Sequence, residues 1–218
     1  MEQEHHDDPY RSTLQRAFDE ALLARDRSTL WRILEELSAT HAPMDIIDHV
    51  VTPALEHIGA AWEEGTIALS QVYMSGRLCE EIIDRFFPHS DIVRADMPPI
   101  AIAVLHDYHV LGKRIVHSIL RTLGYHIVDY GHGIEVDPLV KRVRQDQIAI
   151  LLLSTLMLPS AFLVRDVSQQ LKATNPHIKI IVGGAPFRFD DQLWQQVGAD
   201  AMGRSASDAI GLIDRLRP

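Results

Sequence analysis

A carboxylate and a histidine stand two residues apart in the segment His106-Asp107-Tyr108-His109, shortly before Gly112. An aspartate at this spacing can hydrogen-bond one imidazole nitrogen, which fixes the tautomer and leaves the other nitrogen free to bind a metal. Because glycine has no side chain, the backbone at Gly112 can approach a bulky group closely at the start of a helix. Taken alone, the pattern is more typical of a loop histidine that an aspartate holds in place.

Two further segments carry hydroxyls or glycines directly after apolar runs. In residues 153–160, Ser154 and Ser160 flank an apolar stretch, and a proline before Ser160 suits the first turn of a helix. Gly183 and Gly184 permit backbone torsions that other residues avoid. A helix cap and a tight turn would explain these segments without any ligand.

The elements that must position these segments differ between the two halves of the chain. In residues 9–88 apolar side chains recur about every 3.6 residues, with breaks near 26–28, 43 and 65, which predicts an antiparallel bundle of four helices. Residues 89–98 contain prolines and polar residues that predict a linker. From residue 99 onward, short β-rich apolar runs alternate with amphipathic segments.

This alternation predicts an α/β domain over residues 99–218, with crossover helices on a parallel sheet. The expected strands cover 100–105, 126–130, 148–153 and 178–182, and a short edge strand ends near 198–201. Five strands suit a flavodoxin-like, Rossmann-like wind, in which ligands bind at the carboxyl ends of the strands. Because the three segments above each follow a strand, we expect them to meet at one end of the sheet.

The composition is that of a globular protein, and we expect it in the cytoplasm. A formal net charge of −9 argues against nucleic acid or an anionic membrane as the main partner. No apolar run approaches the ~20 residues needed to span a bilayer. The single cysteine, Cys79, excludes an internal disulfide and a cysteine-rich metal centre, and we expect it to be a buried structural thiol. The twelve histidines are scattered, so most are interpreted as surface residues.

In combination, the three segments resemble a known family. Asp107-x-His109-x-x-Gly112, then Ser154-x-Leu156, then Gly183-Gly184 is similar in order and spacing to the cobalamin-binding domain of methionine synthase, corrinoid methyltransferase proteins and B12-dependent mutases. The resemblance covers residues 99 to 217 and is far more specific than any one segment. It implies that the dimethylbenzimidazole tail of the cofactor leaves cobalt and enters the domain, and that His109 replaces it as the lower axial ligand.

The resemblance also implies roles for neighbouring residues. Asp107 would hydrogen-bond His109, and Ser160 would extend this relay. The glycines, Ser154 and Leu156 would line the tunnel for the nucleotide tail. Val110-Leu111 departs from the Asp-Ile that the family often has, which should change loop packing and leave ligation intact. The full set of cofactor-binding residues expected in this domain is Asp107, Tyr108, His109, Val110, Gly112, Ser154, Leu156, Leu158, Ser160, Gly183 and Gly184.

The helical half has its own resemblance. Residues 59–65, which contain Trp62, and residues 69–74 are similar to the cap bundle that precedes such domains. In that cap an aromatic side chain covers the upper face of the corrin. The resemblance gives this role to Trp62 and places Val72 and Tyr73 near the upper ligand. A tryptophan at the end of a bundle is by itself more often a core residue.

Three functions fit these observations. The first is a carrier subunit, without a complete active site of its own, that moves a methyl group as methylcobalamin between partner methyltransferases. The second is a B12-dependent light or ligand sensor (a photoreceptor) that uses adenosylcobalamin and acts through a signalling partner. Photoreceptor regulators carry Glu-His where this chain has Val72 and Tyr73, which favours the carrier. The third is a receiver-like domain without a corrin, which would need an aspartate where Ser154 stands. The oligomeric state stays open, a homodimer included.

Overall fold

The structure is a computed structural model that describes residues 9–88, 94 and 96–217. The chain divides into two compact units, Met1–Phe86 and Phe87–Pro218, which are described separately. Residues 89–93 and 95 of the expected linker lie outside the described residues. Within the described ranges, no helix combines the length and the apolar character that crossing a membrane requires.

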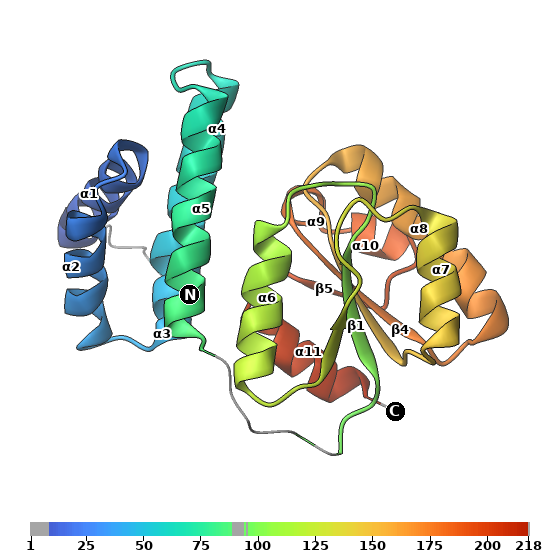
Figure 1. The fold of residues 1–218 in the computed structure, drawn as a ribbon. Helices are drawn as coiled ribbons and strands as arrows, with labels where there is room; N and C mark the ends of the chain where they lie inside the picture. The colour runs from blue at the N-terminus through green and yellow to red at the C-terminus, as the bar shows by residue number, and fades with distance from the viewer. Residues whose placement is uncertain (1–8, 89–93, 95, 218) are drawn as a thin grey trace, which may run out of the picture. The chain divides into compact units, whose positions relative to one another are not determined.

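The first unit is a helical bundle, as the apolar spacing predicts (Figure 1). Its helices are α1 (Pro9–Ala24), α2 (Arg27–Ser38), α3 (Pro43–Ile46), the π-helical turn η1 (Ile47–Val51), α4 (Thr52–Glu63) and α5 (Leu69–Phe86). Because α3, η1 and α4 follow one another without a break, they form one continuous helix. The described part of this unit therefore contains four helical segments. Helix α1 packs against α2, α4 and α5.

The core of this bundle contains the single cysteine. Cys79 is fully buried on α5, and Phe18 and Leu22 of α1 and Ile82 of α5 are also buried. Burial, with a smaller effect from the charge of Glu80, raises the pKa of the Cys79 thiol to about 12. The thiol therefore stays protonated at neutral pH and behaves as a small apolar side chain, as expected from the sequence.

The second unit is a parallel sheet of five strands. They are β1 (Ile100–Val104), β2 (Ile127–Asp129), β3 (Ile150–Ser154), β4 (Lys179–Gly183) and β5 (Ala201–Gly203). Their order across the sheet is β2-β1-β3-β4-β5, and every neighbouring pair is parallel. This is the flavodoxin-like order: β2 is added on one side of β1, and β3 to β5 are added on the other. The predicted fold class is therefore confirmed.

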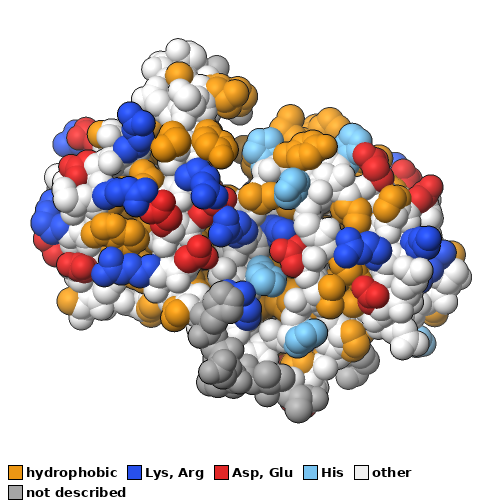
Figure 2. Space-filling view, in the orientation of Figure 1, with side chains coloured by type: hydrophobic (Ala, Val, Ile, Leu, Met, Phe, Trp, Pro, Cys, Tyr) orange, Lys and Arg blue, Asp and Glu red, His pale blue; other side chains and the backbone are white. Residues whose placement is uncertain are grey.

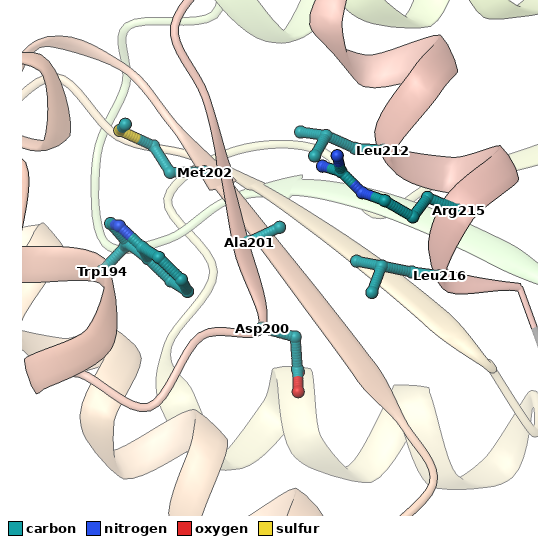
Figure 3. A pocket seen from close by; sticks show the side chains of 7 residues that line it. All are labelled: Trp194, Asp200, Ala201, Met202, Leu212, Arg215 and Leu216. Carbon is teal, nitrogen blue, oxygen red and sulfur yellow. The ribbon is translucent and has the colours of Figure 1, made fainter.

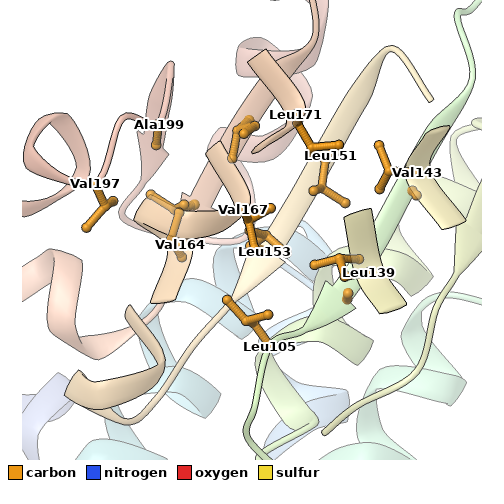
Figure 4. Close-up of a cluster of buried hydrophobic side chains, with 14 of the residues drawn as sticks. Leu105, Leu139, Val143, Leu151, Leu153, Val164, Val167, Leu171, Val197 and Ala199 are labelled. Carbon is orange, nitrogen blue, oxygen red and sulfur yellow. The ribbon is translucent and has the colours of Figure 1, made fainter. Parts of the chain in front are cut away.

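Helices cover both faces of the sheet (Figure 1). Helices α6 (Leu111–Thr122) and α11 (Asp208–Leu216) pack on one face. The other face carries α7 (Val136–Gln145) and α8 (Leu158–Thr174), with the short helices α9 (Ala185–Phe189) and α10 (Leu193–Gln196). Figure 4 shows the larger core, in which side chains of β1 and β3 meet α7 and α8. Burial on both faces explains why the strands read as continuous apolar runs.

The first four strands differ from the predicted bounds by one or two residues at their ends, and two other differences are larger. The edge strand begins at Ala201, where it was expected to end, because Gly198 adopts a left-handed φ of +75° and the chain turns there. The amphipathic segment before the edge strand contains two short helices: α9 begins at Ala185, with Pro186 in its first turn, and α10 covers Leu193–Gln196. Neither difference moves the strand ends that carry the candidate site.

Candidate functional site

The three segments singled out in the sequence lie together at the carboxyl ends of the central strands. In the sheet register Val104 pairs with Ser154, and Ser154 pairs with Gly183. The loops that follow β1, β3 and β4 therefore leave the sheet side by side. The space-filling view shows histidines among hydrophobic side chains at this upper end of the α/β unit (Figure 2).

Asp107 is the organising residue of the site. It is 3% exposed, and its Oδ1 accepts hydrogen bonds from the backbone N–H groups of Tyr108 and His109 at 2.6 Å and 3.0 Å. Its Oδ2 accepts two more from the N–H groups of Leu156 and Met157, both at 3.1 Å. The carboxylate thus joins the loop after β1 to the loop after β3.

The same carboxylate holds the imidazole of His109. The Nδ1 atom lies 2.5 Å from Oδ1 of Asp107. Burial alone would raise the pKa of Asp107, but the hydrogen bonds from the ring and backbone of His109 and from Leu156 and Met157 outweigh it and hold the pKa at about 2. An ionised carboxylate can only accept, so Nδ1 carries the proton and Nε2 keeps its lone pair. The side chain of His109 is 56% exposed, which leaves Nε2 accessible to a metal.

Ser160 does not extend this relay. Its hydroxyl donates to the carbonyl oxygen of His106 at 3.2 Å, and both oxygens of Asp107 are occupied by other donors. Nor does it cap α8, whose N-cap is Met157, with Pro159 in the first turn. Ser160 therefore supports the backbone beside Asp107, and its expected role as a hydrogen-bond partner of Asp107 is corrected.

His106, the other histidine of the loop, is oriented differently. Its φ of +48° is left-handed, and its Nε2 lies 3.5 Å from Oε1 of Glu135. Among the described residues its ring is paired with Glu135, whereas the ring of His109 is hydrogen-bonded to Asp107. The geometry therefore favours His109 over His106 as a metal ligand.

The glycines around the site allow the loops after the strands to pack closely, because a side chain at these positions would meet neighbouring protein atoms. A Cβ on Gly112 would lie 3.3 Å from Oγ of Ser154. A Cβ on Gly184, whose φ is +116°, would lie 1.8 Å from the carbonyl oxygen of Thr155. The hydroxyl of Thr155 is buried and has no hydrogen-bond partner among the described residues. Because buried hydroxyls are rarely left unpaired, this atom suits a polar ligand that enters between the strand ends.

Large apolar side chains surround the site and are exposed to solvent. Tyr108 is 75% exposed, and Leu156, Met157 and Leu158 are each about half exposed. Val110, the N-cap of α6, is half-buried beside them. A folded domain seldom exposes so many apolar side chains next to one another, so this group suits contact with a large, flat apolar ligand.

The sequence analysis missed the loop after β2, which also borders the site. Gly131 and Gly133 adopt left-handed φ values of +84° and +63°, and the ring of Tyr108 lies directly over Gly133. His132 meets Tyr108 edge-on, with ring centroids 5.6 Å apart. The signal that could have found this loop is Gly-x-Gly directly after the second apolar run.

In the helical unit, the three cap residues named from the sequence lie near the end of α4 and the start of α5. Trp62 is 46% exposed and Tyr73 is 67% exposed, while Val72 is half-buried. Exposed Leu69 lies one turn before Tyr73. Trp62 is therefore not a core residue of the bundle, and its indole is available to a ligand or a partner.

A pocket of about 320 Å³ lies elsewhere in the α/β unit, along the edge strand β5 (Figure 3). It is lined by Trp194, Asp200, Ala201, Met202, Leu212, Arg215 and Leu216. None of these residues belongs to the loops that hold Asp107 and His109. The pocket is thus separate from the candidate site.

A doubly wound sheet that presents an oriented imidazole, a buried hydroxyl without a described partner and exposed apolar side chains at its strand ends suits a large cofactor that contains a metal. Residues 97–211 match the family described as B12 binding domain, and residues 14–86 match a second family with the same description. The chain belongs to the B12-binding family.

Relatives and solved structures agree with this assignment. Trimethylamine corrinoid protein 2 of Methanosarcina acetivorans is 27% identical over 210 residues, which cover 89% of this chain and 95% of that protein. Monomethylamine corrinoid protein 1 of Methanosarcina mazei is 27% identical over 199 residues, 87% of this chain and 90% of that protein. The structure of the Methanosarcina barkeri monomethylamine corrinoid protein matches with a TM-score of 0.72 at 22% identity, covering 93% and 97% of the two chains, and shows the same fold.

Proposed function

We propose that this chain is a cytoplasmic corrinoid carrier, which binds cobalamin through His109 and presents a methyl group on cobalt to partner methyltransferases. The observation that carries the proposal is the imidazole of His109, oriented by Asp107 with its Nε2 accessible at the strand ends. The relatives are named as corrinoid proteins of trimethylamine and monomethylamine, which supports methyl transfer from a methylated amine.

The residues present fit the cofactor in three respects: the donor atom of His109, the buried hydroxyl of Thr155 without a described partner, and the exposed apolar side chains around them. Bound cobalamin supplies a cobalt atom that accepts and releases the methyl group. Nε2 of His109 would hold that cobalt, and Asp107 would keep the proton on Nδ1 and fix the ring. Ser154 and the glycines at 112, 183 and 184 would hold the nucleotide tail.

The apolar residues would contact the corrin itself. Tyr108, Val110, Leu156 and Leu158 would form the seat on the α/β unit, where their exposed surface gives a driving force for burial. In the helical unit, Trp62 with Val72 and Tyr73 would exclude water from the upper ligand. Methylcobalamin is the expected form, and adenosylcobalamin is the alternative.

Binding is tested by size-exclusion chromatography. Purified protein mixed with hydroxocobalamin is expected to elute with the red cofactor at about one equivalent, because the axial bond and the buried tail both slow its release. The same experiment with methylcobalamin and adenosylcobalamin ranks the three cobalamins by the amount that elutes with the protein. Elution of all three cobalamins apart from folded protein would contradict the proposal.

Illumination separates the carrier from a sensor. Val72 and Tyr73 offer no carboxylate–imidazole pair toward an adenosyl group, so we expect the same elution volume before and after light with either alkylcobalamin. A carrier is also expected to be remethylated, after reduction, by a corrinoid methyltransferase partner. A light-dependent change in size or in affinity for a partner protein would favour a B12-dependent sensor and a signalling partner instead.

A further inference from the structure

A buried lysine follows Gly112 in the first turn of α6. Lys113 is 4% exposed, and its Nζ lies 2.6 Å and 2.8 Å from the two carboxylate oxygens of Asp129. Moving an ammonium group out of water is costly, and the carboxylate that faces it is only partly shielded, since the Asp129 side chain is 38% exposed. Such an ion pair often adds little net stability. The place of this pair in the fold therefore suggests a role other than stability.

Asp129 connects this lysine to the loop after β2. It is the last residue of β2, and its Oδ1 also accepts the N–H of Gly131 at 2.7 Å. Burial acts to raise the pKa of Asp129, but the ammonium of Lys113 and the N–H of Gly131 outweigh it, and the pKa lies below its ordinary value. Asp129 is therefore ionised at neutral pH, and its contact with Lys113 fastens the start of α6 to residues 131–134.

Residues 131–134 in turn hold the segment that carries the site. The N–H of Gly133 donates to the carbonyl oxygen of Asp107 at 2.7 Å, and the N–H of His106 donates to the carbonyl oxygen of Ile134 at 3.0 Å. His106 has a left-handed φ, which costs free energy and persists only where surrounding contacts enforce it. The loop after β2 supplies these contacts on one side of β1, and the loop after β3 supplies the bonds to Asp107 on the other.

We propose that the Lys113–Asp129 ion pair positions His109 for cobalt, by fixing the loop that braces the backbone of His106 and Asp107. The inference rests on the proposed ligation by His109 and assigns two positioning residues to it. Without the pair, the loop after β2 keeps its backbone hydrogen bonds to His106 and Asp107 but loses its tie to α6. The loop then moves more freely, and the imidazole explores more orientations. The equilibrium between histidine bound to cobalt and histidine released then shifts toward release.

The test uses the full chain loaded with hydroxocobalamin, and Lys113→Met as the variant. The cofactor is expected to stay bound, while the equilibrium constant for histidine ligation falls about tenfold, the lower end of the effect of residues that orient a metal ligand. The visible spectrum reports the ligated fraction. After reduction to Co(II), the nitrogen splitting in the electron paramagnetic resonance spectrum reports it independently. In the variant without cofactor, the backbone amide hydrogen of Gly133 is expected to exchange with solvent faster than in the wild-type protein without cofactor.

Two controls separate positioning from stability. Lys172→Met breaks another Lys–Asp pair, in which Nζ lies 3.0 Å from Oδ2 of Asp200 near the β5 edge, and it should leave ligation unchanged. The double variant Lys113→Met/Asp129→Asn removes both charges and should regain stability but not ligation.

Wild-type ligation in Lys113→Met, or ligation that returns together with stability in the double variant, would overturn the inference. A wild-type protein that binds cobalamin without histidine ligation would instead overturn the proposed role of His109.

Discussion

His109→Ala is expected to convert bound cobalamin completely from the histidine-ligated form to a form without this ligand, with a shift of the visible spectrum. The affinity should fall at least about tenfold, since even residues that only orient a metal ligand contribute that much. The fold should survive, because the imidazole is 56% exposed and its loss still leaves Asp107 with four backbone N–H donors. Absorption spectroscopy and circular dichroism of the same sample measure both effects.

The matched control is His106→Ala. His106 lies in the same loop and is similarly exposed, but its ring faces Glu135. Its replacement should leave the spectrum of bound cobalamin as in the wild type. The assignment of the ligand would be reversed if the His106 variant lost the histidine-ligated spectrum while the His109 variant retained it.

The sheet and the meeting of the three segments could be predicted from the sequence because both depend on strong local signals. Strands buried on both faces appear as apolar runs such as Ile100–Val104, and the residues after them must gather at one end of a parallel sheet. In the structure Val104 pairs with Ser154, and Ser154 pairs with Gly183, so the three strands do end at the same edge of the sheet. The family resemblance added the identity of the ligand, which spacing alone left open.

The hydrogen-bond partners could not be predicted in the same way, because they depend on where loops pass in space. Ser160 was expected to hydrogen-bond Asp107, but the backbone N–H groups of Leu156 and Met157 donate to that carboxylate, and the Ser160 hydroxyl donates to the carbonyl oxygen of His106. The contact between Lys113 and Asp129 joins residues 16 apart, and nothing in the spacing of these two residues indicates it. Long-range polar contacts of this kind require the coordinates.

Gly184→Ala is expected to cost at least about 3 kcal/mol of unfolding free energy, the largest effect on stability among the variants considered. The φ of +116° is unfavourable for alanine, and the new Cβ would lie 1.8 Å from the carbonyl oxygen of Thr155. Since backbone cannot rotate away as a side chain can, the loop after β3 must shift. That loop donates the N–H groups of Leu156 and Met157 to Asp107, so cobalamin binding should weaken as well.

Gly131→Ala measures the conformational part of this effect alone, so that the difference from Gly184→Ala gives the steric part. Gly131 also has a left-handed φ, of +84°, but a Cβ there meets nothing within 4 Å. Its replacement should cost only about 1–2 kcal/mol, the conformational penalty of a left-handed residue with a side chain. Urea unfolding of both variants, monitored by circular dichroism, gives the two free energies. Equal losses would mean that the turn after β4 does not approach Thr155 closely, and that Gly184 is not required for the packing of the two loops.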